Sequence, residues 1–208
     1  MNIETVIFDF GNVIALFDYR IAAGRLGAPL GLSGEALMDR AADLGFRDLL
    51  MDFESGRVTP DEFVLELKTR LELPQDPASI AADWADIFAP NDPVHALAHE
   101  LKDSGFRLVL GSNTNAIHAN HFVRQFDTLL SRFDALVFSH EVGAMKPAAA
   151  FYDQCVAVSG SPAERCLFID DMPENVQGAK ERGLQALHFR DSDTLVSDLK
   201  SLGLYSKP

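Results

Sequence analysis

Polar side chains that could do chemistry stand at the ends of four short apolar runs of the chain. They are Asp9 after the first run, Ser112 and Asn113 at the end of the second, Lys146 beyond the third, and Asp170 and Asp171 at the end of the fourth. In an open parallel sheet, ligands collect outside the carboxyl ends of the strands. If these runs are such strands, carboxylates, a hydroxyl and an ammonium group gather at one edge of the sheet.

Each of these residues has an ordinary structural explanation when it is taken alone. A single Asp or Ser after a strand is commonly a turn or capping residue, and a single Lys is commonly a solvated surface residue. Asp170 and Asp171 are different, because adjacent carboxylates after a buried strand repel each other unless a cation or a Lys intervenes. Capping does not require all of these groups on four runs, so the set favours a chemical site.

An oxygen-rich site with several carboxylates and neither His nor Cys suits Mg²⁺, which one or two carboxylates and a substrate phosphate usually hold. The negative charges of Asp9, Asp170 and Asp171 would be balanced by Lys146 and Mg²⁺. This balance matters because 18 Lys and Arg against 31 Asp and Glu give the chain a net charge of −13. That charge repels polyanions and anionic lipid, so nucleic acids and membrane surfaces are not expected partners.

Five short apolar runs are the expected strands. They are Thr5–Phe8, Leu108–Leu110, Ala135–Phe138, Cys166–Ile169 and Ala186–Phe189. The runs are too continuous for half-exposed strands and suit a parallel sheet that is covered on both faces. From the second run onward they alternate with helical patterns, which predicts an α/β fold with a doubly wound, Rossmann-like core and a parallel five-stranded sheet.

A long segment separates the first expected strand from the second, and it exceeds what a crossover connection requires. Its pattern is helical throughout: Ser33 can cap one helix, and Thr59–Glu62 reads as a capping box. A further helix is expected around Trp84, which we interpret as a residue of an apolar core. We therefore predict a smaller α-helical domain over residues 15–90, inserted after the first strand of a core domain formed by residues 1–14 and 91–208.

The composition of the 208-residue chain is that of an ordinary globular protein, since 47% of the residues are apolar and 24% are charged. Cys155 and Cys166 are too few for a disulfide scaffold and are expected to be small buried side chains. No apolar run approaches the ~20 residues that span a bilayer, and the first residues lack the basic region of a signal peptide. A cytoplasmic location is expected, whereas the sequence does not predict the oligomeric state.

The same residues lie in segments that resemble a known family. The segments VIFDFGNVI, LGSNTN, GAMKP and FIDDMPEN are similar, in this order, to the four motifs of the haloacid dehalogenase (HAD) superfamily of hydrolases. The segment 15–90 resembles the type-1 helical cap of that superfamily, and FESGRVTPDEF resembles a recurring part of the cap. The Gly-Asn pair after Asp9 is similar to the branch that contains α-D-glucose-1-phosphate phosphatase.

This resemblance implies a Mg²⁺-dependent phosphatase whose partner is a small phosphorylated metabolite, such as a sugar 1-phosphate. Asp9 would be the nucleophile and would carry the phosphoryl group as an aspartyl-phosphate, which splits hydrolysis into two easier steps. The phosphoryl group would be held by Ser112, by Asn12 and by the backbone N–H of Asn113. Lys146 would contact that group, fix Asp9 and offset negative charge in the transition state.

The resemblance also implies a set of metal ligands. Mg²⁺ would be bound by Asp9, Asp171 and the carbonyl oxygen of Gly11. Asp170 would bind it directly or through water. Asn175 would orient the acidic loop. Phosphoryl transfer depends mainly on positioning and electrostatic stabilisation, so such a site needs few other groups.

One position departs from the family pattern. The superfamily usually places a second Asp, which acts as general acid and base, two residues after the nucleophile, and Gly11 stands there instead. General acid–base help typically contributes about 10²–10⁴-fold in rate, so a substrate with a good leaving oxygen, such as a sugar 1-phosphate, would lose least. The candidates for delivering the proton are a water molecule and two residues at the expected cap hinge, Asp18 and Tyr19.

Three other functions are alternatives. A 2-haloacid dehalogenase also uses an Asp nucleophile but needs no metal, so the adjacent Asp170 and Asp171 argue against it. A phosphomutase has a similar cap but relies on the acid that Gly11 replaces. A non-catalytic ligand-binding relic would have lost turnover together with that acid, although its nucleophile and metal ligands are intact in the sequence.

The histidines give weaker signals. His95 and His99 are spaced at i and i+4, as in some metal sites, but no third ligand is in view. His118 and His121 follow the second motif and could approach a substrate. We expect His118 and His121 to lie on a solvated helix face.

Overall fold

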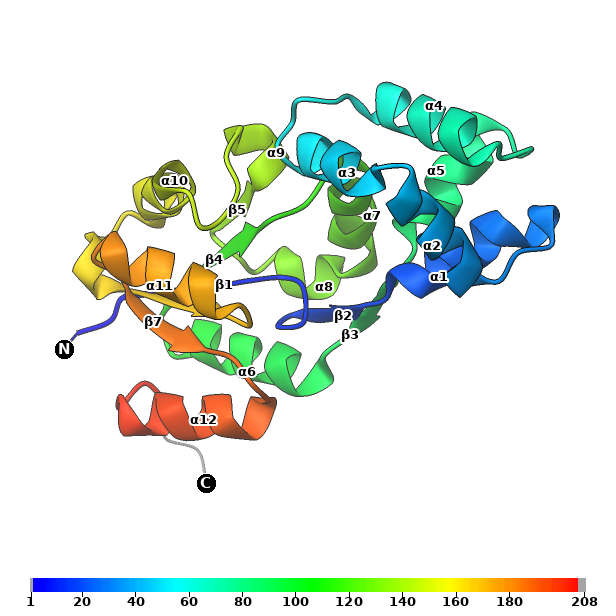
Figure 1. The fold of residues 1–208 in the computed structure, drawn as a ribbon. Coiled ribbons are helices and arrows are strands. Elements are labelled where there is room, and N and C mark those ends of the chain that lie inside the picture. The colour runs from blue at the N-terminus through cyan, green and yellow to red at the C-terminus, as the bar shows by residue number, and fades with distance from the viewer. Residues whose placement is uncertain (1, 206–208) are drawn as a thin grey trace.

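The computed structural model describes residues 2–205, and a parallel sheet lies at its centre (Figure 1). The strands lie in the order β5-β4-β1-β6-β7. Their bounds are Thr5–Phe8 (β1), Arg107–Ser112 (β4), Ala135–Phe138 (β5), Cys166–Asp170 (β6) and Gln185–His188 (β7). All neighbouring pairs are parallel, so the predicted α/β fold with a five-stranded parallel sheet is confirmed.

Both sides of the strands are apolar, which is why helices cover both faces of the sheet. In β1, Val6 and Phe8 pack on one face and Ile7 on the other. The helices of the first face are α6 (Asp92–Asp103), α7 (Ala116–Gln125), α8 (Asp127–Leu130) and α12 (Ser192–Ser201). Those of the second face are α10 (Ala149–Ser159) and α11 (Pro173–Glu181). Cys155 and Cys166 are buried free thiols on this second face, as predicted.

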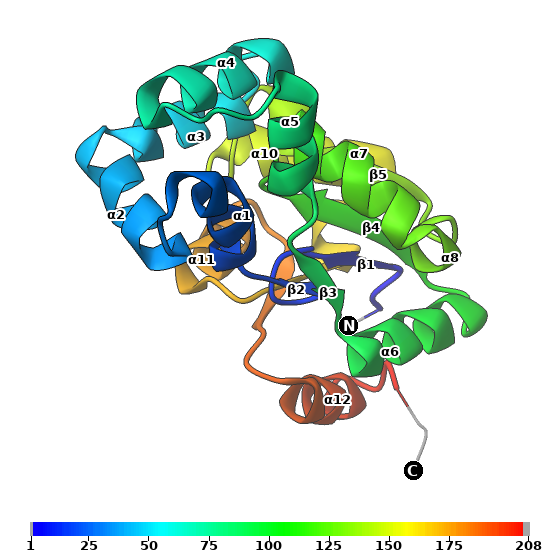
Figure 2. The same ribbon diagram turned by 90° about the vertical axis from the view of Figure 1, so that its right-hand side faces the viewer.

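Residues 19–85 form a second cluster of helices beside the sheet layers (Figures 1 and 2). We call it the α1–α5 group: α1 (Tyr19–Gly27), the short 3₁₀ helix η1 (Ala28–Leu30), α2 (Gly34–Asp43), α3 (Phe46–Glu54), α4 (Pro60–Leu71) and α5 (Pro77–Ala85). Ser33 caps α2 and the Thr59–Glu62 capping box starts α4, both as predicted. The group has an apolar core of its own around Phe63 and Trp84, which confirms the interpretation of Trp84.

The segment 15–90 is not helical throughout, so that part of the prediction is wrong. β2 (Ala15–Phe17) and β3 (Phe88–Pro90) form a two-stranded antiparallel sheet. Three residues are too few to display the two-residue period of a strand, and each of these strands pairs with a partner at the far end of the segment. The pair brings both connections of the α1–α5 group together. The division of the chain into domains at 14/15 and 90/91 stays a prediction.

A buried histidine joins the α1–α5 group to the sheet layers. His118 of α7 is 2% exposed, so its expected position on a solvated face is wrong. Its ring stacks on Trp84 of α5 with 5.2 Å between the ring centroids. Nε2 lies 3.0 Å from the Trp84 carbonyl oxygen, and Nδ1 lies 3.1 Å from the side-chain amide nitrogen of Asn115. The Nε2–H tautomer satisfies both contacts, because Nε2 then donates and Nδ1 accepts.

The helices of residues 2–205 are short. The longest, α4 and α6, have 12 residues each, against the ~20 that a membrane-spanning helix needs. None of the described helices has both the length and the apolar character to cross a membrane. The cytoplasmic location expected from the sequence stays a prediction.

The burial of His118 predicts a loss of stability in mild acid. Burial lowers the pKa of His118 to about 4, whereas an unfolded His titrates near 6.5. Between these values the unfolded chain binds a proton that the folded chain does not, so the free energy of unfolding falls as the pH falls through this window. The share due to His118 is about 2 kcal/mol at pH 5.

Between pH 7.5 and pH 5, the free energy of unfolding should fall for both proteins. We expect the fall to be about 2 kcal/mol smaller for His118→Gln than for the wild type. Urea unfolding at the two pH values measures this difference. His188→Gln is the matched control, because His188 is exposed, and it should keep the wild-type pH dependence. An unchanged pH dependence in His118→Gln would contradict the prediction.

Candidate active site

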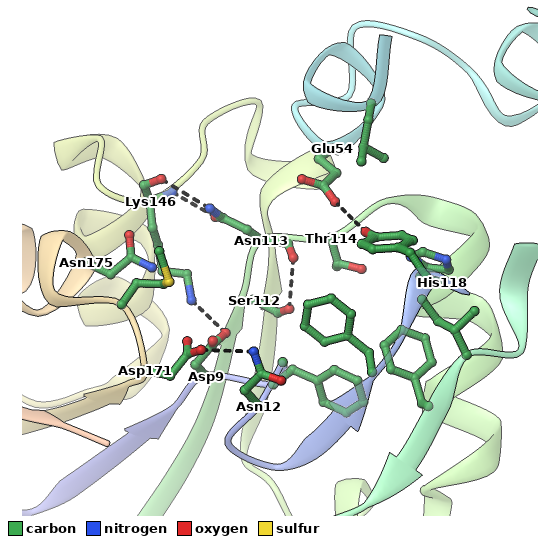
Figure 3. Close-up of a pocket in the computed structure, with 18 residues that line it drawn as sticks. Asp9, Asn12, Glu54, Ser112, Asn113, Thr114, His118, Lys146, Asp171 and Asn175 are labelled. Atoms are coloured by element: carbon green, nitrogen blue, oxygen red, sulfur yellow. Dashed lines mark hydrogen bonds and ion pairs between the residues drawn. The ribbon is translucent and has the colours of Figure 1, made fainter. Parts of the chain in front are cut away.

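A cavity of about 320 Å³ lies where the α1–α5 group meets the sheet, and 18 residues line it (Figure 3). The predicted site residues on its wall are Asp9, Gly11, Asn12, Ser112, Asn113, Lys146, Asp171 and Asn175. Asp170 is fully buried and contacts Lys146. The α1–α5 group contributes Tyr19, Leu50 and Glu54 to the wall. The residues expected from the sequence therefore come together in space.

The order of the strands explains why these residues meet. β1 lies between β4 and β6, and all three run in the same direction. Asp9 follows β1, while Ser112 and Asp170 are the last residues of β4 and β6. Lys146 lies in the loop between α9 (Ser139–Val142), which follows β5, and α10. The ends of neighbouring parallel strands thus deliver the polar groups to one edge, as the sequence predicts.

Lys146 is the buried cation at the centre of the site. Its Nζ lies 2.6 Å from Oδ1 of Asp9, 2.7 Å from Oδ2 of Asp170 and 3.0 Å from the Gly111 carbonyl oxygen. Burial alone would lower the pKa of Lys146, but the charges of Asp9 and Asp170 outweigh burial and raise it. The ammonium group therefore stays charged and uses all three of its protons as hydrogen-bond donors.

The carboxylates carry more negative charge than Lys146 offsets. Burial raises the pKa of Asp9 to about 7; Lys146 opposes this shift, and Asp170 and Asp171 add to it. Burial also raises the pKa of Asp171, against the hydrogen bond from Asn12. Ligand oxygens of the three carboxylates lie within 4.8 Å of one another. This crowded set of oxygen donors fits a hard divalent cation such as Mg²⁺.

The two adjacent aspartates have different surroundings. Asp170 accepts hydrogen bonds at both oxygens: Oδ2 from Lys146, and Oδ1 from the Met172 N–H (2.9 Å) and the Asn175 amide (3.0 Å). Asp171 lines the cavity and accepts a hydrogen bond from Asn12 at 3.0 Å. Asp170 is thus anchored to Lys146 and the start of α11, while Asp171 faces the open space. The contact from Asn175 is the one that its predicted supporting role requires.

Two asparagines have side-chain partners that the sequence does not reveal. The Asn113 side chain accepts from the Lys146 N–H (2.8 Å) and donates to the Lys146 carbonyl (3.1 Å). It therefore clamps the backbone of the lysine. The Asn12 side chain contacts Asp171, and its backbone has a φ of 58°, a left-handed conformation that Asn tolerates better than most residues. Ser112 is 2% exposed at the base of the cavity.

The two candidates for proton delivery are in different places. Asp18 caps α1 and forms an exposed ion pair with Arg20, and it is not part of the cavity wall. Tyr19 does line the cavity, where its hydroxyl donates to Oε1 of Glu54 at 3.5 Å. Glu54 is a functional candidate that the sequence alone does not single out. Its one signal is its place in the FESGRVTPDEF segment, which indicates no more than a part of a cap.

The sequence matches a known family over most of its length. Residues 3–183 match the haloacid dehalogenase-like hydrolases. The sesquiterpene phosphatase of Aspergillus oryzae is 28% identical over 151 residues, which cover 72% of this chain and 76% of that protein. The D-ribitol-5-phosphate phosphatase of Bacteroides thetaiotaomicron is 28% identical over 192 residues, which cover 88% of this chain and 90% of that protein.

The fold is also that of a solved HAD family enzyme from Bacteroides thetaiotaomicron, whose crystal structure is a complex with magnesium and inorganic phosphate. The TM-score is 0.76 at 20% identity, and the match covers 91% of this chain and 95% of the other. The narrower resemblance to α-D-glucose-1-phosphate phosphatase stays a prediction. With the family match spanning the four motifs and the helical group between them, the chain belongs to the haloacid dehalogenase-like hydrolases.

Proposed function

We propose that the protein is a Mg²⁺-dependent phosphatase that hydrolyses the phosphomonoester of a small metabolite through an aspartyl-phosphate on Asp9. The observation that carries this proposal is the contact of Asp9 with the buried Lys146, beside the carboxylates of Asp170 and Asp171. An aspartate in this setting can attack phosphorus while its neighbours stabilise the charge of the transferring group. The phosphatases among the relatives support the same class of reaction.

The chain supplies the groups that hold the phosphoryl moiety. Lys146 keeps Asp9 in place and offsets the negative charge that develops on the phosphoryl oxygens. Those oxygens are bound by Ser112, by Asn12 and by the backbone N–H of Asn113. Ser112 is the last residue of β4 and Asn113 follows it directly, so the sheet sets their positions.

The metal would be held by Asp9, Asp171 and the carbonyl oxygen of Gly11, with Asp170 bound directly or through water. When bound, Mg²⁺ supplies positive charge that allows Asp9 and a phosphate to approach each other. The raised pKa of Asp9 supports this assignment, because it reflects negative charge that the chain alone leaves unbalanced. The magnesium and phosphate in the related solved structure support it as well.

We propose that residues 15–90 form the cap and that the α1–α5 group closes over the reacting groups. Tyr19, Leu50 and Glu54 from this group line the same cavity as Asp9. A cap in this position excludes water during transfer and contacts the leaving group of the substrate. The leaving group would therefore be recognised by the α1–α5 group and the phosphate by the sheet.

A sugar phosphate is the favoured substrate class, with a sugar 1-phosphate as the case that needs least acid catalysis. The polar cap side of the cavity, with Tyr19 and Glu54, suits a hydroxylated leaving group, and one relative is named for a sugar-alcohol phosphate. A second candidate is an apolar alcohol phosphate. An apolar cleft of about 220 Å³ within the α1–α5 group shares Tyr19 and Leu50 with the cavity, and another relative is named for a sesquiterpene.

The remaining alternatives have less support. A 2-haloacid dehalogenase needs no cation, yet Asp171 adds a third carboxylate beside the Asp9 and Asp170 that Lys146 already contacts. A phosphomutase relies on the acid that is missing at Gly11. A non-catalytic relic has no need to keep Asp9, Lys146 and the acidic cluster in contact.

We expect Asp9→Asn to lower the turnover of p-nitrophenyl phosphate by more than about 10³-fold, because an amide oxygen is a poor nucleophile for phosphorus. EDTA should abolish the wild-type activity, and added Mg²⁺ should restore it. A colorimetric assay of p-nitrophenolate release measures both effects, and thermal unfolding checks that the variant is folded. Full activity in folded Asp9→Asn, or activity that EDTA leaves unchanged, would contradict the mechanism.

A panel of phosphorylated metabolites tests the substrate class. We expect a higher kcat/KM for glucose 1-phosphate than for glucose 6-phosphate, because the anomeric oxygen is the better leaving group and depends less on a proton donor. Farnesyl phosphate represents the apolar candidate. Phosphate release measures all three rates under the same conditions. Equal rates for the two glucose phosphates would contradict the leaving-group argument, and a preference for farnesyl phosphate would favour the second candidate.

A further inference from the structure

The position of the missing acid holds a glycine, so it supplies no acid, and a side chain there would require the Phe17 ring to move. A Cβ added at Gly11 would lie 2.8 Å from Cε1 of the Phe17 ring, which is closer than side-chain carbons approach one another. Phe17 belongs to β2, and its ring lines the cavity. An acid for the leaving group must therefore come from another part of the cavity wall.

The titratable side chains of the wall leave one candidate among the described residues. Three of them belong to the phosphoryl and metal site proposed above. Both ring nitrogens of His118 are bonded, one to Trp84 and one to Asn115. Tyr19 donates its hydroxyl proton to Glu54, and burial raises its pKa far above the neutral range. Glu54 remains.

Glu54 lies on the opposite side of the cavity from Asp9 (Figure 3). It is the last residue of α3, and its side chain is partly buried. A nucleophile displaces the leaving oxygen from the opposite side of phosphorus, since the attacking and leaving oxygens are roughly in line. The leaving oxygen of a phosphate on Asp9 thus points away from Asp9, toward the wall that the α1–α5 group supplies.

The backbone of Glu54 is fixed to the core. Ser139 of α9 donates its hydroxyl proton to the Glu54 carbonyl at 2.5 Å, and the same hydroxyl accepts from the Thr114 N–H at 2.9 Å. Thr114 lies two residues beyond the end of β4, next to Asn113. The end of α3 is therefore held against the segment that also carries the phosphoryl-binding residues.

We propose that Glu54 is the general acid and base of this enzyme, in place of the acid that Gly11 lacks. The proposal rests on the phosphatase function proposed above and names the group that protonates its leaving oxygen. Glu54 differs from the usual acid in its origin, because it belongs to the α1–α5 group and not to the loop of the nucleophile. The proton would reach the leaving oxygen only while the α3 end is docked on α9.

The protonation state of Glu54 suits this role. Burial raises its pKa to about 7, against the opposing effect of the hydrogen bond from Tyr19. A carboxyl group with a pKa near the working pH can both give and take a proton, which is the condition for efficient acid–base catalysis. Tyr19 stabilises the carboxylate form that exists between the two steps.

The two chemical steps balance as follows. An oxygen of Asp9 forms a bond to phosphorus, the bond from phosphorus to the leaving oxygen breaks, and that oxygen takes the proton of Glu54. The Glu54 carboxylate then takes a proton from water, whose oxygen attacks phosphorus. The bond between phosphorus and Asp9 breaks, and inorganic phosphate leaves. Asp9 is again a carboxylate and Glu54 again carries a proton.

Two substrates with one aromatic ring each distinguish proton donation from a structural role. The oxygen of p-nitrophenyl phosphate leaves as a stable anion, whereas the oxygen of benzyl phosphate needs a proton. We expect Glu54→Gln to lower kcat/KM for benzyl phosphate by about 10²-fold or more, and to leave kcat/KM for p-nitrophenyl phosphate within about 3-fold of the wild type. Gln has nearly the same size and can still accept the hydrogen bond from Tyr19.

The base role has a separate readout. With p-nitrophenyl phosphate, Glu54→Gln should release about one equivalent of p-nitrophenolate per site in a burst, because water attack on the aspartyl-phosphate becomes slow. Asp52→Asn is the matched control. It also removes a carboxyl group from α3, but Asp52 pairs with Arg57 on the surface. This variant should match the wild type with both substrates.

Equal losses of kcat/KM with the two substrates would overturn the proposal, because they would show a binding or folding defect. Unchanged rates with both substrates would also overturn it. A wild-type protein that is silent with both substrates and Mg²⁺ would instead refute the proposed phosphatase. The two failures are thereby distinguished.

Discussion

The ammonium group of Lys146, shared between Asp9 and Asp170, is the interaction on which the rest of the site depends. The Lys146 side chain is 1% exposed, so water contributes little to its solvation. A charge in this position is tolerated only with partners, and removing one partner of a buried pair commonly costs about 3–5 kcal/mol. The triad joins the end of β1, the end of β6 and the loop before α10, which are far apart in the sequence. Folding and the proposed chemistry therefore depend on the same contacts.

The triad also accounts for the different environments of the acidic residues. Asp170 uses both oxygens to hold Lys146 and the start of α11, which fixes the direction of the following Asp171 toward the cavity. One lysine cannot neutralise three carboxylates, and the raised pKa values of Asp9 and Asp171 reflect this imbalance. This excess of negative charge favours a bound cation. In the proposed mechanism, that cation would allow an anionic substrate to approach a chain whose net charge is −13.

The sequence predicts those features of the site that follow from one strand at a time. Apolar runs that end in Asp9, Ser112 or Asp170 define strand ends, and parallel strands bring their ends together whatever the rest of the chain does. Other features depend on partners that no local pattern contains. β2 and β3 are strands only because each finds the other, and His118 is buried only because α5 covers it. Glu54 sits on the wall because the end of α3 docks on Ser139.

The glycine at position 11 links these two kinds of feature. Without a side chain there, the Phe17 ring of β2 packs against the loop that follows Asp9, and β2 in turn pairs with β3 at the base of the α1–α5 group. The Phe17 ring therefore occupies the space beside Gly11, close to Asp9 and to the base of the α1–α5 group. That group also carries Tyr19 and Glu54, so a carboxyl group lies on the wall opposite Asp9 although Gly11 supplies none (Figure 3). In the proposed mechanism, the sheet would bind the phosphoryl group, and the α1–α5 group would transfer the proton and recognise the leaving group.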